Sequence, residues 1–301
     1  MEATSMVVAA GGVVVDYASI ASAAAKRAVG GGSSGALAGV VQVLSLMWLR
    51  TAMNYEYRYG GEGMVSTVRK LFEEGGIPRL YRGVGFALVQ SPLSRFGDAG
   101  ANAAVPALLA SLAEAGVVPA LPLAASQAAA SVAAASWRVA ITPVDTVKTT
   151  LQVDGALDPL GQRIAEDGPL VLWRGAFTAA AATFVGNYPW FLTYNALDAA
   201  IPPTEGDMLL ELTRRATLGV AASCASDVCS NSLRVIKTGV QTGGADGPIE
   251  YARSVWANEG PAGLFGRGLQ TRLSVNCLQG AVFSVAWKYF ERTLLVPSAR
   301  G

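Results

Sequence analysis

The sequence contains no histidine among its 301 residues, and it has only three cysteines. Histidine is the commonest metal ligand and the commonest general base, so its absence argues against hydrolase triads, zinc enzymes and haem proteins. Cys224, Cys229 and Cys277 show no CxxC spacing and lie in apolar segments, which favours buried free thiols over a disulfide framework. The glycine run at 30–32 lacks the lysine of a phosphate-binding loop. We therefore expect no enzyme, no catalytic residue, no cofactor and no metal.

Charged residues are also scarce. They make up 15% of the chain, against 51% hydrophobic residues, and the mean hydropathy is +0.36. Soluble globular chains average about 25% charged residues, so this chain has too few to cover a water-exposed surface. The composition predicts a protein of the lipid bilayer. A net charge of +1 is too balanced for a nucleic-acid-binding surface, so no nucleic-acid partner is expected.

What the chain does have is a motif that occurs three times. An acidic residue and a glycine are followed by an aromatic residue and then by a basic residue with glycine, at 74–83, 167–175 and 259–268. The closing glycines, Gly83, Gly175 and Gly268, lie 92 and 93 residues apart. A second motif precedes each copy, clearest at 143–152 and weaker at 45–54 and 232–241. Two motifs in constant order at a near-constant period indicate three tandem repeats.

The repeats predict the domain organisation, which is an N-terminal extension at 1–32 and repeats at 33–115, 116–205 and 206–301. Each repeat holds two long, weakly charged segments, at 35–54, 83–109, 119–152, 175–200, 209–241 and 268–295. A helix needs about 20 residues to cross the hydrocarbon core, so each segment is long enough. Between the two segments of the first repeat, in 63–74, apolar residues recur at helical spacing, which predicts a surface helix. The extension is read equally well as a membrane-associated segment or as an alanine-rich tail.

The whole chain beyond about residue 30 resembles the mitochondrial carrier family. That family combines P-x-[DE]-x-x-[KR]-x-[RK]-x-Q on odd-numbered helices with the [DE]-G…aromatic-[RK]-G motif, and the region from Pro143 to Gly175 matches both closely. The resemblance implies an all-α membrane protein, a six-helix pseudo-threefold barrel in which each repeat adds a short matrix surface helix. It also implies a multi-pass protein of the mitochondrial inner membrane, with cardiolipin at the N-termini of the surface helices.

By this resemblance, the first motif forms a gate on the matrix side. Proline kinks the helix, and the acidic and basic residues point to the central axis, where they pair between repeats. The gate positions are Met47, Arg50, Asp145, Lys148, Arg234 and Lys237. The family's pairing scheme places Asp145 against Lys237, Arg234 against Arg50, and Lys148 against the uncharged Met47. Two of the three salt bridges are therefore expected to be missing.

A second gate is expected on the cytoplasmic side. Counting from the closing glycines places it on Asn195, Asp198, Lys288 and Glu291, while repeat one has no charge at the corresponding positions. If the family geometry holds, Asp198 and Lys288 form one bridge of reversed polarity. The alternative is that these are solvated charges at helix ends.

Between the gates the resemblance predicts a cavity. Arg138 and Asp227 occupy equivalent positions on adjacent odd helices and are expected to pair, either as part of a substrate site or as a structural clamp. The substrate contact positions are Gln90, Ser91, Ala182, Thr183, Val275 and Asn276. None is charged, which favours a small neutral or zwitterionic substrate. Arg95 and Asp98 are expected to satisfy each other locally.

Two functions remain open. The chain is either a carrier that moves a small metabolite by alternating access, or a carrier-fold protein that no longer transports and serves as a structural subunit of a respiratory membrane complex. The degraded gates favour the subunit, whereas the intact second repeat and the polar cavity favour the carrier.

Overall fold

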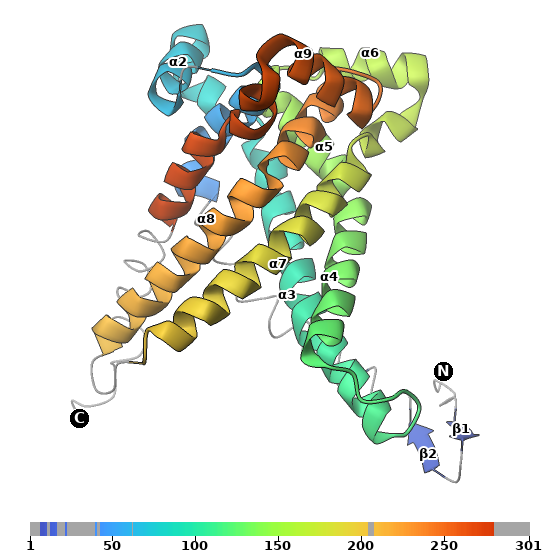
Figure 1. Cartoon of the computed structure of the whole chain (residues 1–301). Helices are drawn as coiled ribbons and strands as arrows, with labels where there is room; N and C mark the ends of the chain where they lie inside the picture. Colours follow the sequence, from blue (N-terminus) through green and yellow to red (C-terminus); the bar gives the residue numbers. More distant parts are fainter. Residues whose placement is uncertain are drawn as a thin grey trace, which may run out of the picture.

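The computed structural model of the chain describes residues 7–10, 13–16, 22, 40, 43–61, 63–203 and 208–279. Within that part, one set of helices runs roughly side by side and a second set gathers at one end of the molecule (Figure 1). The side-by-side helices are a helix at 43–59, α3 (Val84–Glu114), α4 (Leu123–Ala140), α5 (Thr142–Val153), α7 (Ala176–Ala200), α8 (Met208–Gln241) and a helix at 269–279. The helices gathered at one end are α2 (Met64–Leu80), α6 (Asp158–Asp167), α9 (Pro248–Gly266) and the 3-10 helix η1 (Pro169–Trp173).

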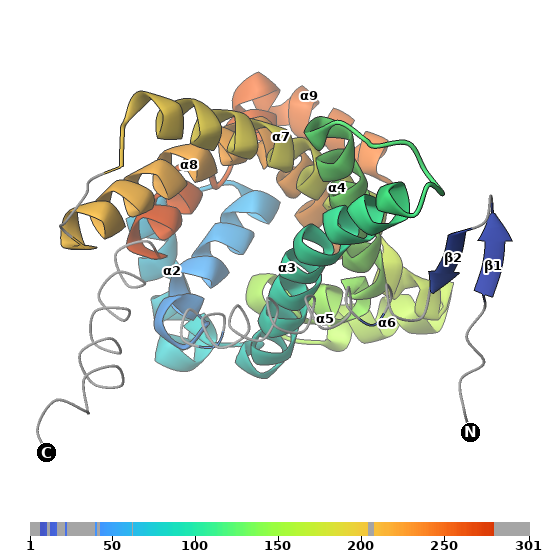
Figure 2. The same ribbon diagram turned by 90° about the horizontal axis from the view of Figure 1, so that it is seen from below.

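The side-by-side helices form a ring. Helix α3 packs on α4, α4 on α7, and α7 on α8, and Figure 2 shows this order from below. The helix at 43–59 closes the ring on both sides. Its residues Val43 and Met47 pack with Ala87 of α3, and its Leu49 packs with Val275 of the helix at 269–279. The described helices therefore form a ring, in agreement with the helical carrier fold that the family resemblance implies.

Proline ends one helix of the ring and starts the next. The segment expected as one span at 119–152 consists of α4 and α5, which meet at Ile141. Pro143 lies in the first turn of α5, where its missing N–H costs no hydrogen bond, but its ring prevents an uninterrupted helix through this point. The kink predicted from the first motif is confirmed in this repeat.

The three closing glycines hold the repeats against one another. Gly83, Gly175 and Gly268 have φ values of 81°, 80° and 63°, a left-handed conformation that favours glycine. A Cβ atom on Gly83 would lie 3.2 Å from the carbonyl oxygen of Lys148, and one on Gly175 would lie 3.1 Å from that of Lys237. On Gly268 it would lie 3.2 Å from the carbonyl oxygen of Met53. Each glycine thus lets its own repeat approach the backbone of the next.

The N-terminal extension adds two short strands to the otherwise helical fold. Strands β1 (Val7–Ala10) and β2 (Val13–Asp16) form a two-stranded antiparallel sheet in which Val7 faces Asp16 and Ala10 faces Val13. The expectation of a membrane-associated segment or of an alanine-rich tail did not include these strands. The run of valines explains the difference, because β-branched side chains favour strands over helices.

No helix in the described part of the chain combines the length and apolarity that a bilayer crossing requires.

Candidate functional site

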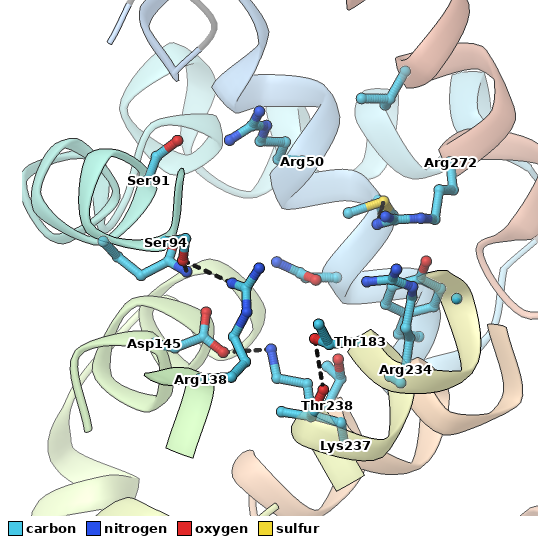
Figure 3. A pocket seen from close by; sticks show the side chains of 18 of the residues that line it. Arg50, Ser91, Ser94, Arg138, Asp145, Thr183, Arg234, Lys237, Thr238 and Arg272 are labelled. Atoms are coloured by element: carbon cyan, nitrogen blue, oxygen red, sulfur yellow. Dashed lines mark hydrogen bonds and ion pairs between the residues drawn. The ribbon is translucent and has the colours of Figure 1, made fainter. Parts of the chain in front are cut away.

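A cavity of about 450 Å³ lies inside the ring (Figure 3). Side chains from the helix at 43–59, from α3, α4, α5, α7 and α8, and from the helix at 269–279 line it. All six residues expected at the matrix gate are among its lining residues, and so are all six expected substrate contacts. The register counted from the closing glycines therefore brings together residues from all three repeats.

Asp145 is the centre of an ionic cluster in this cavity. Its carboxylate pairs with Lys237 of α8, and it lies 2.8 Å from Nζ of Lys148 on its own helix. Gln241 donates to the same carboxylate at 3.4 Å. The expected contact between Asp145 and Lys237 is present. Lys148, expected opposite Met47, instead bonds to Asp145 and to Gln90, because these acceptors lie within its reach.

Neutral hydrogen bonds connect repeats one and two at the corresponding level. Gln152 of α5 donates to the sulfur of Met47 at 3.4 Å and to the hydroxyl of Thr51 at 3.4 Å, while Asn54 donates to Gln152 at 2.7 Å. Met47, Thr51 and Gln152 are all buried. A polar contact without formal charge thus takes the place of the salt bridge that Met47 cannot make.

The expected pair between Arg138 and Asp227 is wrong. Arg138 of α4 binds Asp98 at 2.8 Å and the hydroxyl of Ser94 at 2.7 Å, both on α3. Helix α4 packs against α3 and α7, and α7 lies between it and α8, which carries Asp227 (Figure 2). Asp98 thus has Arg138 as one partner, while the side chain of Arg95, its expected local partner, lies outside the described residues.

Asp227 is held by the last described helix instead. Its carboxylate is buried and accepts from Nε of Arg272 at 2.6 Å and from the amide of Asn276. Arg234 of α8 lies 3.7 Å from the same carboxylate. Sequence reasoning missed Arg272, although it stands four residues after Gly268, one helical turn before the counted contact position.

The cytoplasmic gate is only partly within the described chain. Asp198 lies 2.7 Å from Arg214 of α8, which is its ionic partner among the described residues. Arg214 is close because a short connection joins α7 to α8, and it also donates to the carbonyl oxygen of Ile201 at 2.8 Å. Asn195 is exposed, and Lys288 and Glu291 lie outside the described residues.

The cavity has the chemistry of a binding site for a polar solute. Within the described chain, no group of three or more acidic or cysteine side chains is placed to hold a metal ion. The three cysteines are at least partly exposed and form no disulfide, in contrast to the buried thiols expected. The cavity walls are instead rich in guanidinium, ammonium, amide and hydroxyl groups.

Comparison with known proteins agrees with this geometry. Residues 119–203 and 210–297 match the family model for mitochondrial carrier proteins. The chain belongs to the mitochondrial carrier family. Members of that family are transporters and not enzymes, in agreement with the expectation from composition. The two matched segments fall in the second and third expected repeats.

Individual carriers share part of this sequence. Over 179 residues, or 53% of each chain, it is 29% identical to mitochondrial thiamine pyrophosphate carrier 1 of Kluyveromyces lactis. It is also 29% identical over 163 residues to mitochondrial substrate carrier family protein S of Dictyostelium discoideum, covering 49% of this chain and 57% of the relative. A segment of 65 residues is 43% identical to the mitochondrial arginine transporter BAC2 of Arabidopsis thaliana, 22% of that protein. The chain spans about half the length of the first two relatives.

Proposed function

We propose that this carrier-family chain moves a small metabolite across the mitochondrial inner membrane by alternating access. One observation carries the proposal, namely a polar cavity lined by residues of all three repeats and enclosed in a ring of helices. A solute bound there contacts every repeat at once, so its binding energy can act on the contacts between repeats. The family's mitochondrial carriers support the location.

In this mechanism the cluster around Asp145 closes one side. Charges in a low-dielectric interior are costly unless paired, so the contact between Asp145 and Lys237 favours the closed arrangement. A substrate that offers Lys237 or Lys148 a new partner lowers the cost of separating the repeats. The neutral contact between Met47 and Gln152 then separates with less resistance than a salt bridge. Asn195 and Asp198 belong to the opposite gate in the same scheme, together with Lys288 and Glu291.

A second function is favoured by one specific feature, the composition of the gate. Asp145 is the one acidic residue among the six gate positions, so a cycle of three salt bridges cannot form there. A chain that serves as a structural subunit of a respiratory membrane complex does not need a gate that opens and closes. Cardiolipin at the N-termini of the surface helices fits either function.

Native purification in mild detergent, followed by reconstitution, separates the two functions. A transporter is expected to migrate alone and to take up solute into liposomes. Thiamine pyrophosphate and arginine, for which two relatives are named, are the first probes. Lys237→Gln removes the contact with Asp145 and should alter uptake, whereas Arg69→Gln on the exposed side of α2 should not. Co-migration with a large complex, without uptake of any probe, would support the subunit instead.

A further inference from the structure

The cavity carries more positive than negative charge. Figure 3 shows basic side chains reaching toward it from different helices. The lining residues include six cations, which are Arg50, Arg138, Lys148, Arg234, Lys237 and Arg272. Asp98 and Asp145 are the acidic residues that line it in the described chain, and Asp227 lies directly behind Arg272. Leaving Arg50 out of the count, five cations still share three carboxylates.

The surplus positive charge is concentrated in two groups of residues, in each of which two cations share one carboxylate. Lys148 and Lys237 both bind Asp145, and Arg234 and Arg272 both approach Asp227. One carboxylate neutralises one cation, so each group retains a positive charge. Like charges held together in a partly buried site repel one another, and an incoming anion relieves that repulsion.

The group formed by Arg234 and Arg272 is better suited to bind an anion than the group formed by Lys148 and Lys237. Nε of Arg272 is occupied by Asp227 at 2.6 Å, while Nε of Arg234 donates to Ser230 at 3.2 Å. A guanidinium has five N–H donors, so both arginines keep donors for another acceptor. The buried side chain of Tyr57 lines the same cavity and interacts with Arg272. Arginine forks match the paired oxygens of phosphate and carboxylate groups.

We propose that the substrate of this carrier is an anion bearing a phosphate or carboxylate group, and that Arg234 and Arg272 bind that group, an inference that rests on the proposed function. The uncharged contact positions led to the expectation of a neutral or zwitterionic substrate. That expectation was based only on the counted contact positions of the even helices. It left out Arg272, which lies one helical turn before Asn276. A cationic substrate such as arginine is disfavoured by the same surplus charge.

Binding can be tested without transport. The full chain, purified in detergent, is titrated with pyrophosphate, with malonate and with L-arginine at matched ionic strength, and its thermal unfolding temperature is followed. Pyrophosphate and malonate distinguish a phosphate site from a carboxylate site. At least one of them is expected to raise the unfolding temperature in a saturable way, whereas L-arginine is not. Arg234→Gln leaves Asp227 bound to Arg272 and Asn276, so this variant should fold and bind the anion about tenfold or more weakly.

Two controls complete the test. Arg69→Gln removes an exposed arginine on α2 and should leave the anion titration unchanged. The double variant Asp227→Asn with Arg272→Gln removes one charge of each sign and keeps the surplus, so weaker binding there assigns the effect to the guanidinium itself. Equal anion affinity in the wild type and in both cavity variants would overturn the proposal. Uptake of neutral solutes without anion binding would also overturn the anion proposal, but it would leave the proposed carrier function intact. Anion binding without uptake of any solute would support the anion site and count against the carrier function.

Discussion

Arg79, in the surface helix α2 of the first repeat, donates a hydrogen bond to the main-chain carbonyl of Val153, the last residue of α5 in the second repeat, at 2.8 Å. The same guanidinium donates to the carbonyl of Gln152 at 2.8 Å and pairs with Glu74 at 3.2 Å. The last carbonyls of a helix have no partner within that helix. Arg79 therefore satisfies carbonyls of its neighbour's helix end and joins the two repeats.

Arginines perform the same task at the other two junctions. Arg163 of the second repeat donates to the carbonyl of Gln241, the last residue of α8, at 3.0 Å. Arg267 of the third repeat donates to the carbonyl of Arg58, near the end of the helix at 43–59, at 2.9 Å. Each repeat thus caps an odd helix of the next one, and the third returns to the first. This closed cycle stabilises the end of the barrel where the surface helices gather.

Replacing Arg79 with alanine should destabilise the protein. The side chain is buried, and the change removes two hydrogen bonds to main-chain carbonyls, for which we expect a loss of about 2–3 kcal/mol in the free energy of unfolding. Thermal unfolding of the detergent-purified chain measures the loss. Arg69→Ala, at an exposed position of the same helix, should change stability little. Equal unfolding temperatures for the two variants would show that the cap contributes nothing.

The shared carboxylate of Asp145 should be more sensitive than either of its lysines. Asp145→Asn leaves Lys148 and Lys237 close together without a counterion, and breaking a buried pair costs about 3–5 kcal/mol. Lys148→Gln keeps the pair between Asp145 and Lys237 and should cost less. The double variant Asp145→Asn with Lys237→Gln should be more stable than the sum of its single changes predicts. A double-mutant cycle by thermal unfolding measures this coupling, and a coupling of zero would exclude a direct interaction.

Close packing of α3 on α4 depends on a glycine. A Cβ atom on Gly97 would lie 1.9 Å from Cδ1 of Trp137, whose Nε1 donates to the carbonyl of Leu93 at 2.8 Å. Gly97→Ala must displace this fixed ring, and overpacking of that kind costs about 1–3 kcal/mol. Gly219→Ala in α8 is the matched control, because a Cβ there meets no atom within 4 Å. Adding Trp137→Leu should restore part of the stability lost in Gly97→Ala. If thermal unfolding shows no difference between Gly97→Ala and Gly219→Ala, and no rescue by Trp137→Leu, the contact between Gly97 and Trp137 does not limit the packing of α3 on α4.

Helix positions were the most predictable part of this fold. Segments expected at 175–200 and 209–241 form α7 (Ala176–Ala200) and α8 (Met208–Gln241), each within one residue. The reason is physical, since Gly175 marks a helix start that requires a left-handed backbone. The same glycines set the register by which all six expected contact positions line the cavity. Local chemistry and a constant period were sufficient for this.

Side-chain partnerships were much less predictable. Arg138 was assigned to Asp227 because the two occupy equivalent positions, yet each binds a residue of an even helix, Asp98 or Arg272. Threefold symmetry relates the repeats but does not determine which helix lies nearest to a given side chain. The substrate class depends on the same detail. The charge of the cavity comes from residues on several helices, and the counted contact positions alone do not include these residues.

The ion pair between Glu259 and Arg267 should make the third junction sensitive to acid. The hydrogen bond from Arg267 holds the pKa of Glu259 below its ordinary value, and Arg267 also contacts the carbonyl of Arg58 in repeat one. A lowered pKa in the folded state means that the contribution to stability is present above the ordinary glutamate pKa. It is lost as the pH falls through the lowered value.

The unfolding temperature of the wild type should therefore fall on acidification by more than that of Glu259→Gln, which lacks the titrating group. Thermal unfolding followed from neutral to acidic pH measures the difference, and Glu166→Gln, an exposed position on α6, controls for the loss of a carboxylate in general. Because the side chain of Glu259 is 40% exposed, solvent screening keeps the effect small, and the effect should shrink further at high salt. Parallel curves for the wild type and Glu259→Gln would mean that Arg267 holds repeat one through the carbonyl of Arg58 without help from its acidic partner.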